Sequence, residues 1–239
     1  RGLTRTLGEI DVCRDEQGRP CFSAGNSAAV FRIRLGGRIR SLRCYLRPMR
    51  HLKEIYGQPL LEKELYLHTS PETGVWVDTV LGNWIEGSTL HETVAQAAAL
   101  RDRESLQILV RLFDRLALAL VTDDRAHGDL KPENIIVGDD GTLCPIDFDA
   151  SYLPAFAGEI SPELGTAAYQ HPARTAADFD ERIDDYPAAL ISTALHALAE
   201  DPTLWDRYGS SDGLLYTPQR IASDPAYRET LALFEKRGM

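Results

Sequence analysis

The sequence has few cysteines, no long apolar run and a shortage of positive charge, and each lack argues against a class of protein. Its four cysteines contain no Cys-x-x-Cys pair and no disulfide framework, so we expect reduced thiols in a cytoplasmic protein. The longest uninterrupted apolar run, residues 116–121, is too short to cross a bilayer. No signal peptide is recognisable. The chain opens with Arg1 rather than Met, so we expect a piece of a longer protein.

The net charge of the sequence argues against a further class of protein. The formal net charge of -10 opposes non-specific nucleic-acid binding, which needs a basic face. An ATP-binding enzyme can still be acidic overall, because a few local cations and Mg²⁺ meet the phosphates. The hydrophobic fraction of 44% supports a real core in a chain of 239 residues.

The first part of the chain has the pattern of an antiparallel sheet. Residues 30–35 and 38–46 alternate in polarity and are joined by two glycines, which predicts a β-hairpin. Two more strands are expected at residues 60–68 and 75–81, around the turn SPETG. A helix is expected between them and the hairpin, with Pro48 in its first turn.

The later part has helical periodicity, interrupted by two short strands around residues 135–137 and 143–146. The expected helices cover residues 89–100, 103–124, 186–200 and 225–238. We therefore predict an α+β chain with a mainly β lobe over residues 1–82 and a mainly α-helical lobe over residues 83–239.

A polar motif separates the second expected helix from the short strands. Residues 127–134 read HGDLKPEN, and Asp147 follows within IDFD. Phosphoryl transfer depends on positioning and charge neutralisation, and Mg²⁺ prefers carboxylate and amide oxygens. The alternative interpretation is a polar turn after a helix.

The ordered set HGDLKPEN, IDFD, GTAAYQHP and IDDYPAA resembles the protein kinase superfamily over most of the chain. The resemblance implies a bilobal kinase-like fold. It also implies that Asp129 is the catalytic base, that Lys131 contacts the transferred phosphate, and that Asn134 and Asp147 bind Mg²⁺.

The same resemblance gives supporting roles to other residues of this region. HGDLKPEN, residues 127–134, would be the catalytic loop, and Asp184 or Asp185 would anchor its backbone. His127 would support the structure of the loop rather than carry a proton. Adenine would lie between Val30 and Ile136. Its hydrogen bonds would go to the connector over residues 83–86, which includes Glu86.

The amino-terminal part matches the family more loosely. SAGNSAAV, residues 23–30, fits the register of the phosphate loop, with Gly25 as the one retained glycine. Ser41 and Arg43 stand at the alanine and lysine positions of the next strand and share one of its faces. Arg43 would grip the phosphates, the alternative being a solvated strand arginine.

The carboxylate partner of Arg43 should follow on the next helix. Glu54 is the candidate, with Glu62 or Glu64 as alternatives if the helix boundaries are shifted.

Three departures from the family pattern have consequences. Gly128 replaces the arginine that grips a phosphorylated segment in many kinases, so we expect activity without phosphorylation of Thr166. Asp149 replaces a glycine and would bind a second Mg²⁺ or be an exposed loop aspartate. GTAAYQHP resembles the end of a kinase activation segment, and Ala173 replaces the glutamate that normally closes that segment.

Three functions follow from the resemblance. The first is a Ser/Thr protein kinase that uses ATP and Mg²⁺, or Mn²⁺, on a protein substrate, and Lys131 favours it. The second is a nucleotide-binding pseudokinase that serves a regulatory partner, and the third is a small-molecule kinase. A narrower similarity, to compact bacterial kinase-like proteins, lies in RSLRCYL, PIDFDASYLP, YQHP and DDYP.

Overall fold

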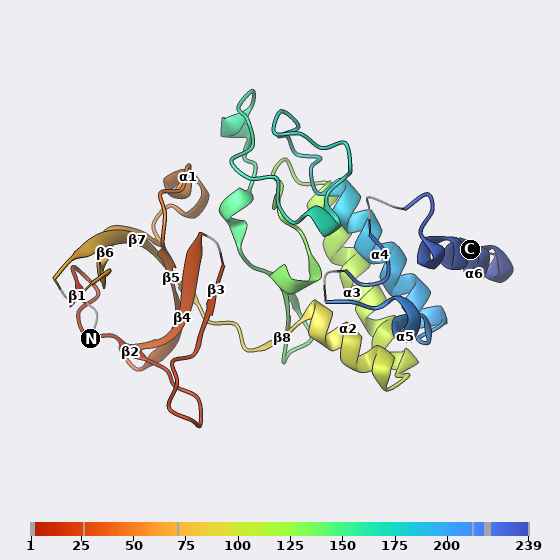
Figure 1. The fold of residues 1–239 in the computed structure, drawn as a ribbon, viewed down its shortest axis with the longest axis horizontal. Coiled ribbons are helices and arrows are strands. Elements are labelled where there is room, and N and C mark those ends of the chain that lie inside the picture. The colour runs from red at the N-terminus through yellow and green to blue at the C-terminus, as the bar shows by residue number, and fades with distance from the viewer. Residues whose placement is uncertain (1–2, 26, 71, 212, 218–220, 239) are drawn as a thin grey trace. The chain divides into compact units, whose positions relative to one another are not determined.

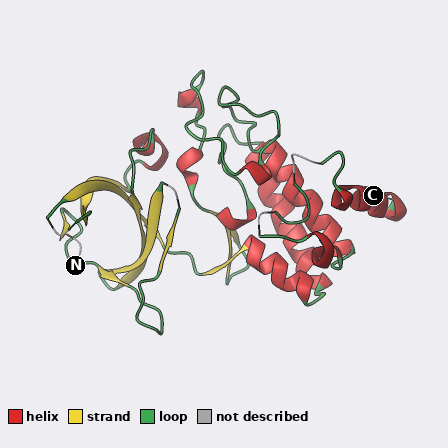
Figure 2. Cartoon of the chain, viewed as in Figure 1, coloured by secondary structure: helices red, strands yellow, loops and turns green. Residues whose placement is uncertain are grey.

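The chain divides into two units, Arg1–Ile85 and Glu86–Met239. The computed structural model describes residues 3–25, 27–70, 72–211, 213–217 and 221–238. Strands dominate the first unit and helices the second (Figure 2). The protein is therefore an α+β chain, and its first unit contains a curled antiparallel sheet (Figure 1).

The sheet of the first unit follows the order β1-β6-β7-β5-β4-β2, with β3 also paired to β4. Its strands are β1 (Leu3–Thr4), β2 (Asp11–Val12), β3 (Phe22–Ala24), β4 (Ala28–Leu35), β5 (Arg38–Tyr45), β6 (Leu60–His68) and β7 (Gly74–Asn83). The hairpin β4–β5 is confirmed, with Leu35 opposite Arg38. Gly36 and Gly37 have φ of 54° and 77°, which a tight two-residue turn requires.

Alternation along these strands gives the sheet two different faces. Ile33, Leu42 and Cys44 are buried on one face in the main apolar cluster of this unit. Ala28 and Tyr45 belong to a second cluster, with Leu52 and Val80. A strand residue and its second neighbour share a face, so Arg43 lies on the face of Tyr45.

The helix of the first unit is shorter than expected. α1 covers Leu52–Tyr56 and ends at Gly57, as predicted. Its start was wrong, because His51 has φ of 62° at the amino-terminal boundary and Pro48 lies outside the helix. A left-handed residue cannot continue a right-handed helix back toward the proline.

The second unit is built on three packed helices, α2 (Leu90–Ala99), α3 (Arg103–Val121) and α4 (Asp185–Glu200). Thr89 caps α2 through a capping box with Glu92, and the Asp102 carboxylate caps α3. Each cap satisfies backbone N–H groups that the helix itself leaves open. The core lies between these helices and includes Leu106, Phe113, Ile191 and Leu195.

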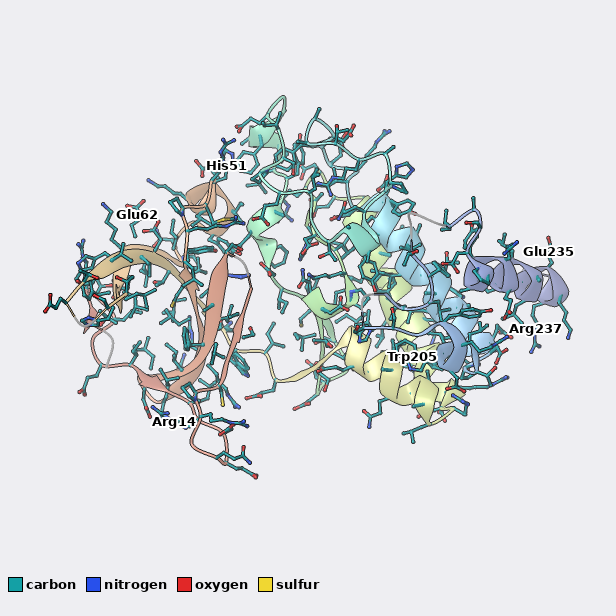
Figure 3. The ribbon with its side chains drawn as sticks, viewed as in Figure 1. Arg14, His51, Glu62, Trp205, Glu235 and Arg237 are labelled. Atoms are coloured by element: carbon teal, nitrogen blue, oxygen red, sulfur yellow. The ribbon has the colours of Figure 1, made fainter. Side chains whose placement is uncertain are left out.

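Smaller elements complete the second unit. α5 (Leu204–Tyr208) lies beside α2, and the labelled Trp205 makes an edge contact with the His91 ring (Figure 3). α6 (Pro225–Arg237) packs on α4. Among the residues that the structure describes, none of the helices combines the length and apolar character that a bilayer span requires.

A three-stranded sheet, ordered β10-β9-β8, holds the polar motif in place. Its strands are β8 (Gly87–Thr89), β9 (Ile135–Gly138) and β10 (Leu143–Pro145). Residues 127–134 form the later part of the connection from α3 to β9, and Asp147 follows β10 by two residues. The two short strands expected from the sequence are thus confirmed, and they bring the two halves of the motif to one end of a hairpin.

Candidate functional site

Asp184 holds the backbone of the loop that carries the polar motif. Its carboxylate accepts hydrogen bonds from the backbone N–H groups of His127 and Gly128, the latter at 3.0 Å. Asp184 is 1% exposed, and burial raises the pKa of its carboxyl group against the effect of those hydrogen bonds. Of the two anchors that the sequence left open, Asp184 is therefore the one that holds the loop.

The His127 side chain binds backbone groups, in agreement with the structural role expected for it. Its ring is buried and lies 4.9 Å from the Phe148 ring, centroid to centroid. Nδ1 accepts from the Asp129 backbone N–H at 3.3 Å, which requires Nε2 to carry the proton that is donated to the Ile146 carbonyl at 2.7 Å. Both ring nitrogens are thus occupied by backbone groups.

Asp129 is the centre of a polar cluster. Its Oδ1 accepts from the Thr166 backbone N–H at 2.6 Å, and its Oδ2 accepts from Asn134 Nδ2 at 3.1 Å. Lys131 Nζ lies 3.3 Å from the same Oδ2 and donates to Thr166 Oγ1 at 2.8 Å. The structure therefore brings Asp129, Lys131 and Asn134 into direct contact, together with a threonine from a distant segment.

The amide of Asn134 has a defined orientation. Nδ2 also donates to the Asp129 carbonyl at 2.9 Å, so the nitrogen faces Asp129 and the amide oxygen is directed away from it. Asn134 lies at the end of a short 3-10 turn, Pro132–Asn134, that leads directly into β9. The oxygen is the atom that would serve as a metal ligand.

Asp147 is placed at the same end of the hairpin. The Ile146 N–H donates to the Asn134 carbonyl at 2.8 Å, which extends the pairing of β9 and β10 by one residue. Asp147 comes next and has φ of 68°, a left-handed conformation that turns the chain sharply. Among the described residues, no group of three or more His, Cys, Asp or Glu side chains could hold a metal.

Asp149, two residues after Asp147, corrects one expectation from the sequence. Asp149 is 4% exposed, so the alternative of an exposed loop aspartate is wrong. Asp149 lies in the 3-10 turn Phe148–Ala150, and two residues after this turn Tyr152 pairs with Ala126, directly before the polar motif.

Gly128 has no room for a side chain. Its φ is +82°, and an added Cβ would lie 2.0 Å from the Ala150 carbonyl oxygen. An arginine cannot occupy this position without moving one of the two backbones. The local geometry thus requires glycine at position 128, where the resemblance to kinases leads one to expect an arginine.

The sequence analysis did not single out Arg174, whose guanidinium contacts this loop. Nη1 donates to the Gly128 carbonyl at 3.3 Å and to the Leu164 carbonyl at 3.2 Å. The available signal was an arginine directly after Ala173, the position where the family has a glutamate.

The first unit carries several of the other candidate residues. Val30 stands opposite Arg43 on neighbouring strands, and Ser41 stands opposite Arg32. Val30, Ser41 and Arg43 therefore share one face of the sheet. Ser41 Oγ donates to the Asn83 carbonyl at 3.1 Å.

Gly25 closes the turn from β3 to β4 through a backbone bond to Ala28, and Asn26 of the expected phosphate loop lies outside the described residues.

The acidic candidates of the first unit differ in environment. Glu54 is exposed on α1, and Glu62 is exposed on β6 (labelled in Figure 3). Glu64 is 2% exposed, and both of its oxygens accept hydrogen bonds from Thr6 or Leu7. The Glu64 carboxylate is thus committed to the amino-terminal segment.

Two more candidates lie at the start of the second unit and in its small sheet. Glu86 is exposed just before β8. Ile136 is partly buried on β9, opposite Thr89 and Cys144.

Part of the chain is similar to Ser/Thr protein kinases. It is 28% identical over 165 residues to CBL-interacting protein kinase 17 of Oryza sativa subsp. japonica, covering 65% of this chain and 33% of that protein. It is 34% identical over 113 residues to the serine/threonine-protein kinase PknL of Mycobacterium tuberculosis, covering 45% of this chain and 27% of that protein. The chain thus matches about a third or less of the length of these relatives. No family model matches it.

Proposed function

We propose that the protein is a kinase-like phosphotransferase that uses ATP and Mg²⁺ to phosphorylate a Ser or Thr hydroxyl of a protein substrate. The observation that carries the proposal is the contact of Asp129 with both Asn134 and Lys131 in one loop. The partial similarity to Ser/Thr protein kinases supports the same reaction class.

Each residue of the cluster has a chemical role in this proposal. Asp129 orients the attacking hydroxyl and accepts its proton. Lys131, whose ammonium group lies beside the Asp129 carboxylate, would offset negative charge on the phosphoryl group as it moves. The amide oxygen of Asn134 and the carboxylate of Asp147 are suited to Mg²⁺, which would neutralise the nucleotide phosphates.

The first unit would supply the remaining nucleotide contacts. Val30, Ser41 and Arg43 share one sheet face, which supports a joint role in binding ATP. Arg43 would grip phosphate oxygens with its planar guanidinium. Roles for Gly25, Glu54, Glu86 and Ile136 stay predictions.

A nucleotide-binding pseudokinase is the second candidate, and Arg43 and Asp149 favour it. Arginine at the expected lysine position changes the geometry of phosphate contact. The buried Asp149 adds an acidic residue two positions after Asp147.

One set of assays on the wild-type protein separates the candidates. Transfer of labelled phosphate from ATP to a generic protein substrate, such as casein, supports the protein kinase. A higher melting temperature with MgATP but no turnover supports the pseudokinase, because a ligand that binds only the folded state stabilises it by mass action. Transfer only to an alcohol-bearing metabolite supports a small-molecule kinase. If the protein neither binds nucleotide nor transfers phosphate, all three candidates are refuted.

A further inference from the structure

Arg174 joins two backbone segments through one nitrogen atom. Nη1 lies 3.3 Å from the Gly128 carbonyl, directly before Asp129, and 3.2 Å from the Leu164 carbonyl, two residues before Thr166. Those are the two segments that meet in the hydrogen bond from the Thr166 N–H to Asp129 Oδ1. One guanidinium thus contacts the backbone beside each partner of the hydrogen bond between Thr166 and Asp129.

The guanidinium is held in turn by the segment that carries it. Nη1 also donates to Gln170 Oε1, four residues earlier in the chain. Gly165, between Leu164 and Thr166, has φ of +73°, and an added Cβ would lie 2.8 Å from the Gly128 carbonyl and 2.9 Å from Asp129 Oδ1. The two segments therefore approach more closely than any side chain at residue 165 would allow.

Charge complements this geometry. Burial lowers the pKa of the Arg174 guanidinium, whereas the negative charges of Asp184 and Asp129 oppose that change. Asp184 holds the loop by its N–H groups at residues 127 and 128, and Arg174 holds it by the carbonyl at residue 128. The same stretch of backbone is thus gripped by an anion on its donors and by a cation on its acceptor.

We propose that Arg174 is a positioning residue that fixes Asp129 against the Thr166 segment without any phosphate. The backbone at Gly128 excludes a side chain, so no arginine at this position can bind the segment. Arg174 instead reaches the loop from the far end of the segment and binds backbone carbonyls directly. The segment is therefore ordered by the sequence itself and not by a modification.

The kinetic part of this inference rests on the proposed phosphoryl transfer, whereas the structural part does not. Replacing Arg174 with Met keeps the unbranched apolar stem of the side chain and removes the guanidinium, with its charge and donors. Arg174→Lys keeps the charge, but its side chain is shorter, so its ammonium group cannot occupy the position of Nη1. Arg182→Met is the matched control, because Arg182 is exposed and lines, together with Arg174, a cavity of about 290 Å³.

The kinetic test is run well below the melting temperature of each variant. We expect Arg174→Met to lower kcat at least about tenfold while KM for MgATP changes by less than about twofold, since a misplaced catalytic group slows the chemical step. Arg174→Lys should lie between Met and wild type, and Arg182→Met should match wild type. An unchanged kcat in Arg174→Met, or equal losses of kcat in both Met variants, would overturn the inference.

Hydrogen exchange of the Thr166 amide tests the structural part without any activity. We expect exchange in Arg174→Met to be at least about tenfold faster than in wild type, because loss of the clamp opens the bond to Asp129. Arg182→Met should leave it unchanged. If the wild type transfers no phosphate, the proposed function fails but this comparison still decides the role of Arg174. Unchanged exchange in Arg174→Met would contradict the inference.

Discussion

The backbone N–H of Thr166 donates to Oδ1 of Asp129 at 2.6 Å, although 37 residues separate the two in the chain. The Thr166 hydroxyl accepts from Lys131 at 2.8 Å, so the backbone N–H and the hydroxyl of this threonine both contact the candidate catalytic loop. The threonine thus completes the cluster in its unmodified form.

Phosphorylation of Thr166 should therefore be unnecessary for activity. A phosphate there would place negative charge beside Asp129 and compete for Lys131. We expect phosphatase-treated wild type to keep its activity and Thr166→Glu to be less active than Thr166→Val in the same transfer assay. Loss of activity on phosphatase treatment that Thr166→Glu restores would contradict this expectation.

Asp147 should be needed for metal-dependent nucleotide binding. Asp147→Asn removes the charge that would hold Mg²⁺ but keeps a side chain of the same shape, so MgATP affinity should fall at least about tenfold. Titration calorimetry with MgATP measures the change, and Asp139→Asn, at an exposed turn between β9 and β10, is the control. Equal affinity in Asp147→Asn and wild type would count against the metal site.

Gly128→Ala should destabilise the protein more than Gly141→Ala. Both glycines have positive φ, but an added Cβ at Gly141 meets no atom within 4 Å, whereas one at Gly128 lies 2.0 Å from the Ala150 carbonyl oxygen. We expect losses in the free energy of unfolding of about 1 kcal/mol for Gly141→Ala and about 3 kcal/mol or more for Gly128→Ala. Urea unfolding measures both, and equal losses would show that the close contact is unimportant.

Glu64 should stabilise the protein in a pH-dependent way. Burial would raise the pKa of its carboxyl group, but hydrogen bonds from Leu7 and Thr6 outweigh burial and leave the pKa lowered from 4.5. A lowered pKa in the folded state means that the stabilisation is present above pH 4.5 and is lost as the pH falls through the folded-state pKa.

The test compares Glu64→Gln with Glu62→Gln, an exposed glutamate on the same strand. Glu64→Gln should lower the free energy of unfolding more at about pH 7 than at about pH 3.5, whereas Glu62→Gln should have little effect at either pH. A Glu64→Gln difference that is constant or grows toward acid would show that the sign is wrong.

Local patterns made much of the fold predictable. The β4–β5 hairpin followed from two adjacent glycines between alternating runs, and the long helices followed from apolar spacing. The strands β1, β2 and β3 were not predicted, because they are only two or three residues long and depend on pairing with β6 or β4. Short strands take their conformation from distant partners rather than from their own sequence.

The contacts of the candidate site were predictable where residue types signal them and not where backbone groups make them. The contact of Asp129 with Lys131 and Asn134 could be expected because their motif is contiguous, and the roles of these residues stay predictions. Arg174 was missed because it acts on carbonyl groups, which every residue has. Glu64 was offered as a partner of an arginine on β5, yet its carboxylate binds a segment 57 and 58 residues earlier.

The role of Asp129 is tested most directly by phosphate transfer from labelled ATP, with Mg²⁺ and with Mn²⁺, in wild type and Asp129→Asn. We predict that wild type transfers phosphate to a generic protein substrate and that Asp129→Asn lowers kcat by about 10²- to 10⁴-fold with MgATP affinity nearly unchanged. Equal turnover in the two proteins would contradict the account.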